Sequence, residues 1–376
     1  MAKGIYFGVN GDTPRKVKKI YFGVNGDTPR KVKKVYFGVN GDTPRLCWIG
    51  EAISLRSASP LSEARGYLAA ASLPGYYALF AGGRNNNVTL ATVDAFNSAL
   101  TRSTPTAMSA ARKQLAGARV PSSYMIFAGG SQNNSYSSDM VDAYTASLTR
   151  KTATSLSTVT EEMGGSFVGG YALFAGGVSR VYNSSTVTLK NTVTAYNSSL
   201  TKSTPTALRA ANGAPTGGGI GSYALFAGGF TGSYTNQTPS TAVDAYSTSL
   251  TRSAAAALGQ ARKNMAYAQV GDYAIFAGGY PSTKDADAYN AALTRTAITP
   301  ISQNTSNRCG ASISGFALIQ CGSSAMDAYD AALTKSIAPP LSESRSELVA
   351  AESIGQYALF GGGSPSSDVV DAYYSN

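Results

Sequence analysis

The feature that most constrains this chain is a dipeptide that recurs at regular intervals. Seven times an apolar run ends in a pair of glycines or an equivalent dipeptide, and a run similar to Asp-Ala-Tyr follows a variable number of residues later. The pairs begin at Gly82, Gly129, Gly176, Gly228, Gly278, Cys321 and Gly362, so the steps between them are 47, 47, 52, 50, 43 and 41 residues. Repeats of this length with several short strands per copy are typical of propellers and solenoids, in which one copy alone cannot bury its apolar face.

Each copy has the turn signals of a small antiparallel sheet. In one copy we expect four short strands, at residues 98–103, 114–120, 124–128 and 140–144, separated by Thr104-Pro105-Thr106, by Ser122-Ser123 and by a variable loop. Four such strands form one blade of a β-propeller. The sequence therefore predicts an all-β fold of seven four-stranded blades.

The two ends of the repeat region complement each other. The last copy stops at residues 371–376 and lacks the Ser-Leu-Thr-Arg-Ser strand that completes the other copies, whereas a similar stretch, 52–57, stands before the first copy. Exchange of this strand would pair both open edges. We therefore expect the propeller to close by pairing its N-terminal and C-terminal strands.

The copies resemble the kelch repeat. Its glycine pair, the tyrosine of its next strand and the arginine before its innermost strand all have counterparts here, while leucines stand where that family has tryptophan. The tyrosines are Tyr144, Tyr196, Tyr246, Tyr289, Tyr329 and Tyr373, the arginines are Arg65, Arg112, Arg262, Arg308 and Arg345, and the leucines are Leu100, Leu148, Leu200, Leu250, Leu293 and Leu333. The resemblance covers about residues 51–376 and implies a seven-bladed kelch-like β-propeller.

Residues 1–50 form a second region with its own repeat. The segment IYFGVNGDTPRKVKK recurs every 15 residues from Ile5, and each copy reads as a strand followed by a reversal at Asn-Gly-Asp-Thr-Pro. Three such strands would make a small meander or one stripe of a multi-chain structure, and the period resembles that of fibrous viral shafts. The alternative is a basic leader that docks onto a larger assembly.

Charge and composition exclude several classes of function. Residues 1–45 hold ten Lys or Arg and three Asp, so they carry +7 of the total formal charge of +10. These lysines alternate with strand residues, so a guarded strand edge explains them at least as well as nucleic-acid binding. The chain has no histidine, which removes the commonest general base and zinc ligand. We expect no enzyme activity, no cofactor and no bound metal.

Targeting signals and cysteines add little. No apolar signal segment and no stretch of about 18 apolar residues is present, so we expect synthesis in a cytoplasm and no membrane insertion. Three cysteines do not make a disulfide framework, although Cys309 and Cys321 could meet across a hairpin.

Two groups of residues are candidates for binding. The variable loops after the glycine pairs carry Tyr136, Tyr182, Tyr234 and Tyr280 among Asn, Ser and Thr, a chemistry suited to glycans or protein partners. The arginines Arg65, Arg112, Arg262, Arg308 and Arg345 could form a partial ring that binds carboxylates or phosphates. In the plainer alternative, which we favour, each arginine ties a loop to backbone carbonyls of a neighbouring blade. The aspartates Asp94, Asp142, Asp244, Asp287, Asp327 and Asp371 would serve strand-end hydrogen bonds, since one per blade is too sparse for a metal site.

Three functions remain open at this point. Lysine-rich leaders of the Gly-Val-Asn-Gly type joined to repeat domains resemble virion or tail-associated proteins of phages and prophages. That resemblance implies a non-enzymatic, homo-oligomeric fibre or adhesin located in the virion, with residues 1–50 on other virion proteins and the propeller on a host-surface glycan or protein. The second hypothesis is a kelch-type protein-interaction scaffold without a viral role, and the third is an enzyme acting on glycans.

Overall fold

The computed structural model describes residues 6–7, 15–16, 21–22, 30–31, 34–37, 45–49, 53–132, 136–182, 186–345 and 350–375. The chain divides into two compact units, Met1–Ser54 with Tyr374–Asn376, and Leu55–Tyr373. No helix of the described residues is both long and apolar enough to cross a lipid bilayer.

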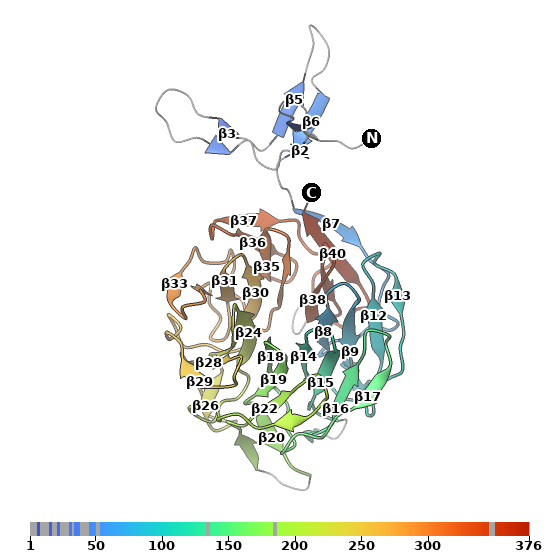
Figure 1. Cartoon of the computed structure of the whole chain (residues 1–376), viewed down its shortest axis with the longest axis vertical. Coiled ribbons are helices and arrows are strands. Elements are labelled where there is room, and N and C mark those ends of the chain that lie inside the picture. Colours follow the sequence, from blue (N-terminus) through green and yellow to red (C-terminus); the bar gives the residue numbers. More distant parts are fainter. Residues whose placement is uncertain are drawn as a thin grey trace. The chain divides into compact units, whose positions relative to one another are not determined.

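The larger unit is a ring of seven four-stranded antiparallel blades, as the repeat spacing predicts (Figure 1). The innermost strands are β8 (Ala69–Leu73), β14 (Ala116–Val120), β18 (Gly164–Val168), β24 (Thr216–Ile220), β30 (Ala266–Val270), β34 (Gly310–Ile313) and β38 (Ala350–Ile354). The second strands are β9 (Tyr77–Ala81), β15 (Tyr124–Ala128), β19 (Tyr171–Ala175), β25 (Tyr223–Ala227), β31 (Tyr273–Ala277), β35 (Phe316–Gln320) and β39 (Tyr357–Gly361).

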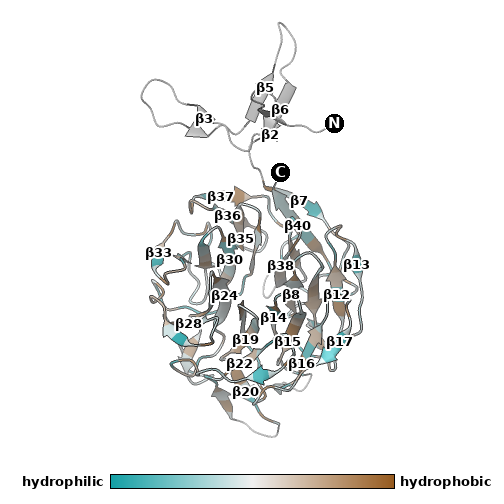
Figure 2. Ribbon diagram, in the orientation of Figure 1, coloured by the Kyte–Doolittle hydropathy of each residue, from teal (hydrophilic) through white to brown (hydrophobic). Residues whose placement is uncertain are grey.

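In the first five blades the two outer strands are together shorter than the two inner ones. The third strands are β12 (Val93–Phe96), β16 (Val141–Tyr144), β22 (Val193–Tyr196), β28 (Val243–Ser247), β32 (Ala286–Tyr289), β36 (Met326–Asp330) and β40 (Val370–Ser375). The outermost strands are β13 (Arg102–Ser103), β17 (Arg150–Thr152), β23 (Lys202–Ser203), β29 (Arg252–Ala254), β33 (Arg295–Ala297), β37 (Lys335–Ala338) and β7 (Ile53–Ser57). Figure 2 shows β13, β17 and β33 in the hydrophilic colour.

Closure of the ring follows the predicted strand exchange. The N-terminal strand β7 is the fourth strand of the last blade, beside β40. Just after β7, the Ala58 amide donates to the Val370 carbonyl at 3.0 Å. The strand expected at 98–103 needs one correction, because Arg102–Ser103 pairs with β12 and so completes the preceding blade. The loop that follows it crosses to the next blade.

A buried tyrosine fastens that crossing loop to the blade it enters. In the second blade Tyr144 packs edge-on against Phe127, with ring centroids 6.1 Å apart, and its hydroxyl donates to the Thr106 carbonyl at 2.9 Å. The equivalent tyrosines bond the equivalent loops, from Tyr196 to Thr154, Tyr246 to Thr206, Tyr289 to Ala256, Tyr329 to Thr299 and Tyr373 to Pro339. The tyrosines shared with the kelch pattern are therefore core residues that join neighbouring blades.

Glycines let the inner strands approach closely around the axis. A Cβ on Gly165 would lie 2.2 Å from the Gly117 carbonyl oxygen, and one on Gly217 would lie 2.0 Å from the Gly165 oxygen. Gly219, two residues further along β24, differs, because its Cβ would meet nothing closer than 3.5 Å. Only the first of these two β24 glycines is required by packing.

The sixth blade departs from the pattern of the others. Cys321 occupies the position of the first glycine of a pair, and both Cys309 and Cys321 are free thiols. Burial raises the pKa of each thiol to about 12. The disulfide considered from the sequence is not formed.

The N-terminal repeats form three separate hairpins in the described residues. β1 (Tyr6–Phe7) pairs with β2 (Arg15–Lys16), β3 (Tyr21–Phe22) with β4 (Arg30–Lys31), and β5 (Lys34–Phe37) with β6 (Arg45–Ile49). Within the described part of these repeats, strands pair inside one copy and no pairing between copies is present, which differs from a meander of three successive strands. Association with further chains stays a prediction.

Gly217 and Gly219 give a matched test of this packing. We expect Gly217→Ala to lower the melting temperature by at least several degrees, because the Gly165 carbonyl leaves no room for a methyl group. Gly219→Ala should leave the melting temperature nearly unchanged. Thermal unfolding of both variants decides the point, and equal effects would contradict it.

Candidate functional site

The glycine pairs lie at the junctions between blades. At six junctions the second glycine donates its N–H, at 2.8 to 3.0 Å, to a carbonyl at one equivalent position in the next crossing loop. The bonds run from Gly83 to Arg112, Gly130 to Thr160, Gly177 to Asn212, Gly229 to Arg262, Gly279 to Thr305 and Gly363 to Arg65. Where Cys321-Gly322 stands, the Gln320 Nε2 instead donates to the Arg345 carbonyl at 3.0 Å. We call these seven acceptor residues the ring positions.

Four of the five candidate arginines occupy ring positions and lie inside the protein. Arg65, Arg112, Arg262 and Arg345 are each at most 1% exposed. Their guanidinium groups pair with buried aspartates, Arg65 with Asp94 at 2.7 Å, Arg262 with Asp287 at 2.6 Å, Arg112 with Asp142 and Arg345 with Asp371.

The same arginines also hold backbone carbonyls of the blade that their loop enters. Arg112 Nη1 donates to the carbonyls of Gly129 and Met140 at 2.8 and 2.7 Å. Burial lowers the pKa of the Arg112 guanidinium, and Asp142 beside it offsets part of that effect. These four side chains therefore fasten loops, as in the plainer alternative, and no ligand can reach them without opening the blade.

Three blades lack an arginine at the ring position, and one of them also lacks the aspartate. In the third blade Thr160 stands at the ring position, and Thr194 stands where the other blades carry aspartate. Both threonines are buried. In the fourth and sixth blades, by contrast, Asp244 and Asp327 stay buried although Asn212 and Thr305 hold the ring positions. Other cations pair with these two aspartates, Arg209 and Arg252 with Asp244 and Lys335 with Asp327.

The sequence spacing predicts that Arg308 belongs to this set, and the structure corrects that. Thr305 accepts the Gly279 bond and so holds the ring position of the sixth blade. Arg308 lies three residues later, half-buried, and donates from Nε to Thr305 Oγ1 at 2.8 Å. The six aspartates also have a role beyond the predicted strand-end bonds, because four of them are the partners of the buried arginines.

The positions two residues after the ring positions have unusual backbone angles. The residues are Tyr67, Gln114, Glu162, Ala214, Asn264 and Asn307, with φ between 49° and 58°. In three cases the backbone amide of one of these residues donates to the backbone carbonyl of the residue before it in the set. The bonds run from Gln114 to Tyr67 at 3.0 Å, from Glu162 to Gln114 at 3.2 Å and from Asn307 to Asn264 at 3.1 Å. A left-handed backbone is unfavourable for Tyr, Gln and Glu, and such strain collects at functional sites.

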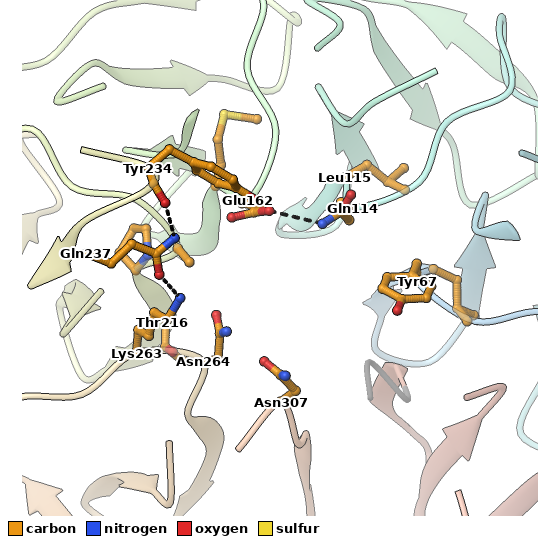
Figure 3. Close-up of a pocket in the computed structure, with 14 residues that line it drawn as sticks. Tyr67, Gln114, Leu115, Glu162, Thr216, Tyr234, Gln237, Lys263, Asn264 and Asn307 are labelled. Atoms are coloured by element: carbon orange, nitrogen blue, oxygen red, sulfur yellow. Dashed lines mark hydrogen bonds between the residues drawn. The ribbon is translucent and has the colours of Figure 1, made fainter. Parts of the chain in front are cut away.

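These six residues line a cavity of about 410 Å³ at one mouth of the central channel (Figure 3). The mouth lies on the loop face, the side of the propeller that carries the loops after the glycine pairs. Tyr234, Gln237 and Lys263 complete its wall. Gln114 Nε2 donates to Glu162 Oε1 at 3.0 Å, Gln237 Nε2 donates to the Tyr234 carbonyl at 3.0 Å, and Lys263 donates to the Gln237 side chain.

The environment of the mouth shifts the pKa values of its charged side chains. Burial raises the pKa of Glu162, and repulsion from the neighbouring Glu161 raises it further. Burial also lowers the pKa of Lys263. Glu161 itself is fully buried and pairs with Arg180 at 2.7 Å. The mouth therefore contains an acidic and a basic side chain whose charged forms are disfavoured by burial.

The loop tyrosines fall into two places on the loop face. Tyr234 lines the mouth, with the Arg180 guanidinium 4.4 Å above its ring. Tyr136 and Tyr182 contact each other edge-on at 4.7 Å, and Tyr280 lies 5.4 Å from the Lys263 ammonium. Tyr182 and Tyr280 are 65% and 52% exposed. The aromatic candidates therefore belong to one loop face, and one of them joins the mouth.

Sequence reasoning missed most residues of the mouth. Gln114, Glu162, Asn264 and Asn307 were not singled out, because each looks like an ordinary loop residue. Their constant offset of two from the ring position was the available signal, and it becomes visible only when Thr160, Asn212 and Thr305 are aligned with the arginines.

Comparisons with known proteins support the fold. No protein-family model matches the chain, and no curated protein matches it by sequence. Among solved structures it is similar to one titled "Structure of YjhT", with a TM-score of 0.55, 10% sequence identity and coverage of 83% of this chain and 99% of that one. This likeness concerns the propeller architecture alone. The kelch and phage resemblances stay predictions.

The third blade suggests a test of the buried pairs. We expect Asp142→Thr to reduce the free energy of unfolding by about 3–5 kcal/mol, because it leaves the buried Arg112 charge uncompensated. Arg112→Thr should reduce it less, because Arg150 still pairs with Asp142 at 3.0 Å. The double variant copies the third blade and should lose clearly less than the sum. Urea denaturation of the four proteins gives the coupling energy, and additive losses would rule out the pair as a unit.

A second test concerns the cost of the mouth carboxylate. Because the folded-state pKa of Glu162 lies above its ordinary value of 4.5, folding stability decreases as pH rises from that value through the raised pKa. Glu162→Gln should therefore stabilise the protein at neutral pH and less so near pH 4.5. Unfolding free energies at the two pH values measure this, and a pH-independent effect would show that Glu162 carries no such cost.

Proposed function

We propose that this chain is a non-enzymatic binding protein whose propeller binds a host-surface glycan or protein through its loop face. The observation that carries the proposal is the mouth, where side chains from several blades meet around one cavity with a carboxylate, an ammonium group, amides and two tyrosines. A propeller fold is consistent with such an interaction role. Variable polar loops on a rigid ring are a common position for recognition.

The chemistry of the mouth favours a glycan over a protein. Amide and carboxylate groups form hydrogen bonds with sugar hydroxyls, and the rings of Tyr67 and Tyr234 offer flat surfaces for the apolar faces of a sugar. Within the described residues, the side-chain amides of Asn264 and Asn307 have no protein partner and are available to such a ligand. The cavity volume of about 410 Å³ suits one or two sugar units rather than a protein segment.

The finer part of the proposal is a virion role. We propose that residues 1–50 attach the chain to other virion proteins, that the protein is a homo-oligomer, and that it is located in the phage particle as a fibre or adhesin. The support is the 15-residue repeat with its lysines and its strand-turn pattern. We include no nucleic-acid partner, no cofactor and no membrane insertion.

The alternative is a kelch-type protein-interaction scaffold without a viral role. Exposed apolar side chains on the loop face favour it, since Val181 is 52%, Tyr182 65% and Tyr280 52% exposed. Such a patch suits a protein partner.

Binding at the mouth can be tested with matched variants. On host-surface glycan arrays and whole host cells, we expect Tyr234→Ala and Asn264→Ala to weaken binding by about tenfold or more, because each removes a direct contact. Tyr76→Ala is the control, because Tyr76 is 51% exposed in the turn between β8 and β9, on the opposite face. Equal loss in all three variants, or binding that the mouth variants do not change, would reject the mouth as the site.

Attachment to a particle needs a separate experiment. The virion proposal expects the full chain to sediment with intact phage particles, and expects deletion of residues 1–45 to release it. Purification as a free cytosolic protein bound to other proteins would support the scaffold instead. Turnover of a polysaccharide by the purified protein would overturn the non-enzymatic assignment.

A further inference from the structure

The other end of the central channel holds a second cavity, of about 520 Å³. It lies on the turn face, the side with the turns between the first and second strands of each blade. Its wall includes the fourth residues of five inner strands, namely Ser72, Arg119, Phe167, Gly219 and Gln269. Glu352, on β38, adds an acidic group to the same wall. This cavity is separate from the loop-face mouth and has different chemistry.

Arg119 has no anionic partner here. Its guanidinium lies 3.9 Å above the Phe167 ring, and within the described residues it forms neither an ion pair nor a hydrogen bond. The ring-position arginines are the opposite case, since each of those guanidinium groups is paired with a buried aspartate. A half-buried guanidinium stacked on an aromatic ring and facing a cavity is prepared to bind a carboxylate through two parallel hydrogen bonds.

The other polar groups of the cavity suit hydroxyls. Glu352 Oε1 accepts from Ser72 Oγ at 2.8 Å and from the Ser353 amide at 3.2 Å, which orients the carboxylate. The Gln269 backbone amide donates to Ser312 Oγ at 2.9 Å, while its side-chain amide has no partner among the described residues. Arg119 and Glu352 both act on the Tyr267 hydroxyl, where Arg119 lowers and Glu352 raises a pKa that burial brings to about 12. One cation and one anion therefore border the same small space.

The free volume of the cavity is not required by packing. Gly219 has no positive φ, and a Cβ there would make only ordinary contacts, at 3.5 Å to the carbonyl oxygens of Phe167 and Tyr223. By contrast, a Cβ on Gly117, Gly165 or Gly217 would lie within 2.2 Å of a neighbouring carbonyl oxygen. A glycine at 219 leaves open space in the cavity that Arg119 also lines and that a side chain could have filled.

We propose that the turn-face cavity binds a small hydroxylated carboxylic acid. Its carboxylate pairs with Arg119, and its hydroxyls donate to Glu352 and to the side-chain oxygen of Gln269. The single negative charge of such a ligand matches one guanidinium, and a second charge on it would face Glu352.

Calorimetric titration with D-glucuronate, D-gluconate and D-glucose tests the proposal on the full chain. We expect at least one of the two acids to bind in the millimolar range or tighter, and glucose, which lacks the carboxylate, to bind at least about tenfold more weakly. Arg119→Gln should reduce the affinity for the acid at least about tenfold. Gly219→Val should do the same by filling the cavity, and it leaves every charge in place.

A loop-face variant separates this site from the mouth. Tyr234→Ala should leave acid binding unchanged, and thermal unfolding should show that Arg119→Gln and Gly219→Val remain folded. Binding of neither acid to the wild-type protein would overturn the proposal. So would acid binding that survives Arg119→Gln or Gly219→Val, or that disappears in Tyr234→Ala. If Arg119→Gln fails to fold, Gly219→Val alone carries the test.

Discussion

The interaction on which the rest of the propeller depends is the hydrogen bond that the second glycine of each pair donates to the next crossing loop. It joins blade to blade at six junctions, and the bond from Gly363 to Arg65 joins the last blade to the first. Only glycine fits there. At Gly82 a Cβ would lie 2.4 Å from the Arg112 carbonyl oxygen, and Gly83 has a φ of 103°.

At four of the seven ring positions, a buried ion pair also holds the crossing loop to the blade it enters. An arginine at a ring position accepts the glycine bond with its carbonyl, while its side chain reaches the third strand of the blade that the loop enters. The free-energy penalty of burying four guanidinium groups is offset because each pairs with an aspartate and donates to backbone carbonyls. The third blade, with Thr160 and Thr194, shows that a junction also forms without this ion pair, and the fourth and sixth blades form theirs with Asn212 and Thr305 in place of the arginine.

Closing the ring leaves a channel whose two ends differ in chemistry. On the loop face, left-handed residues with amide, carboxylate and aromatic side chains surround one cavity. On the turn face, serines, glycines, Arg119 and Glu352 surround another. The loop-face cavity is lined mainly by residues that precede the inner strands, and the turn-face cavity by residues of the inner strands and the turns after them, so a single substitution alters one sector of one cavity. Such a scaffold can vary its binding surfaces without disturbing the junctions between blades.

The sequence alone determined the architecture. The repeat spacing and the turn residues are local signals that recur in every copy, and the two ends of the repeat region complement each other. Seven blades, four antiparallel strands per blade and the exchange of 53–57 could all be predicted in this way. The site could be predicted only in part. Tyr182 and Tyr280 are on the exposed rim as expected, but Arg65, Arg112, Arg262 and Arg345 are buried, because sequence does not reveal that the aspartate some 25 to 30 residues later folds onto the arginine. Gln114, Glu162 and Arg119 come together with residues of other blades only when the ring closes, and that meeting is decided by tertiary structure alone.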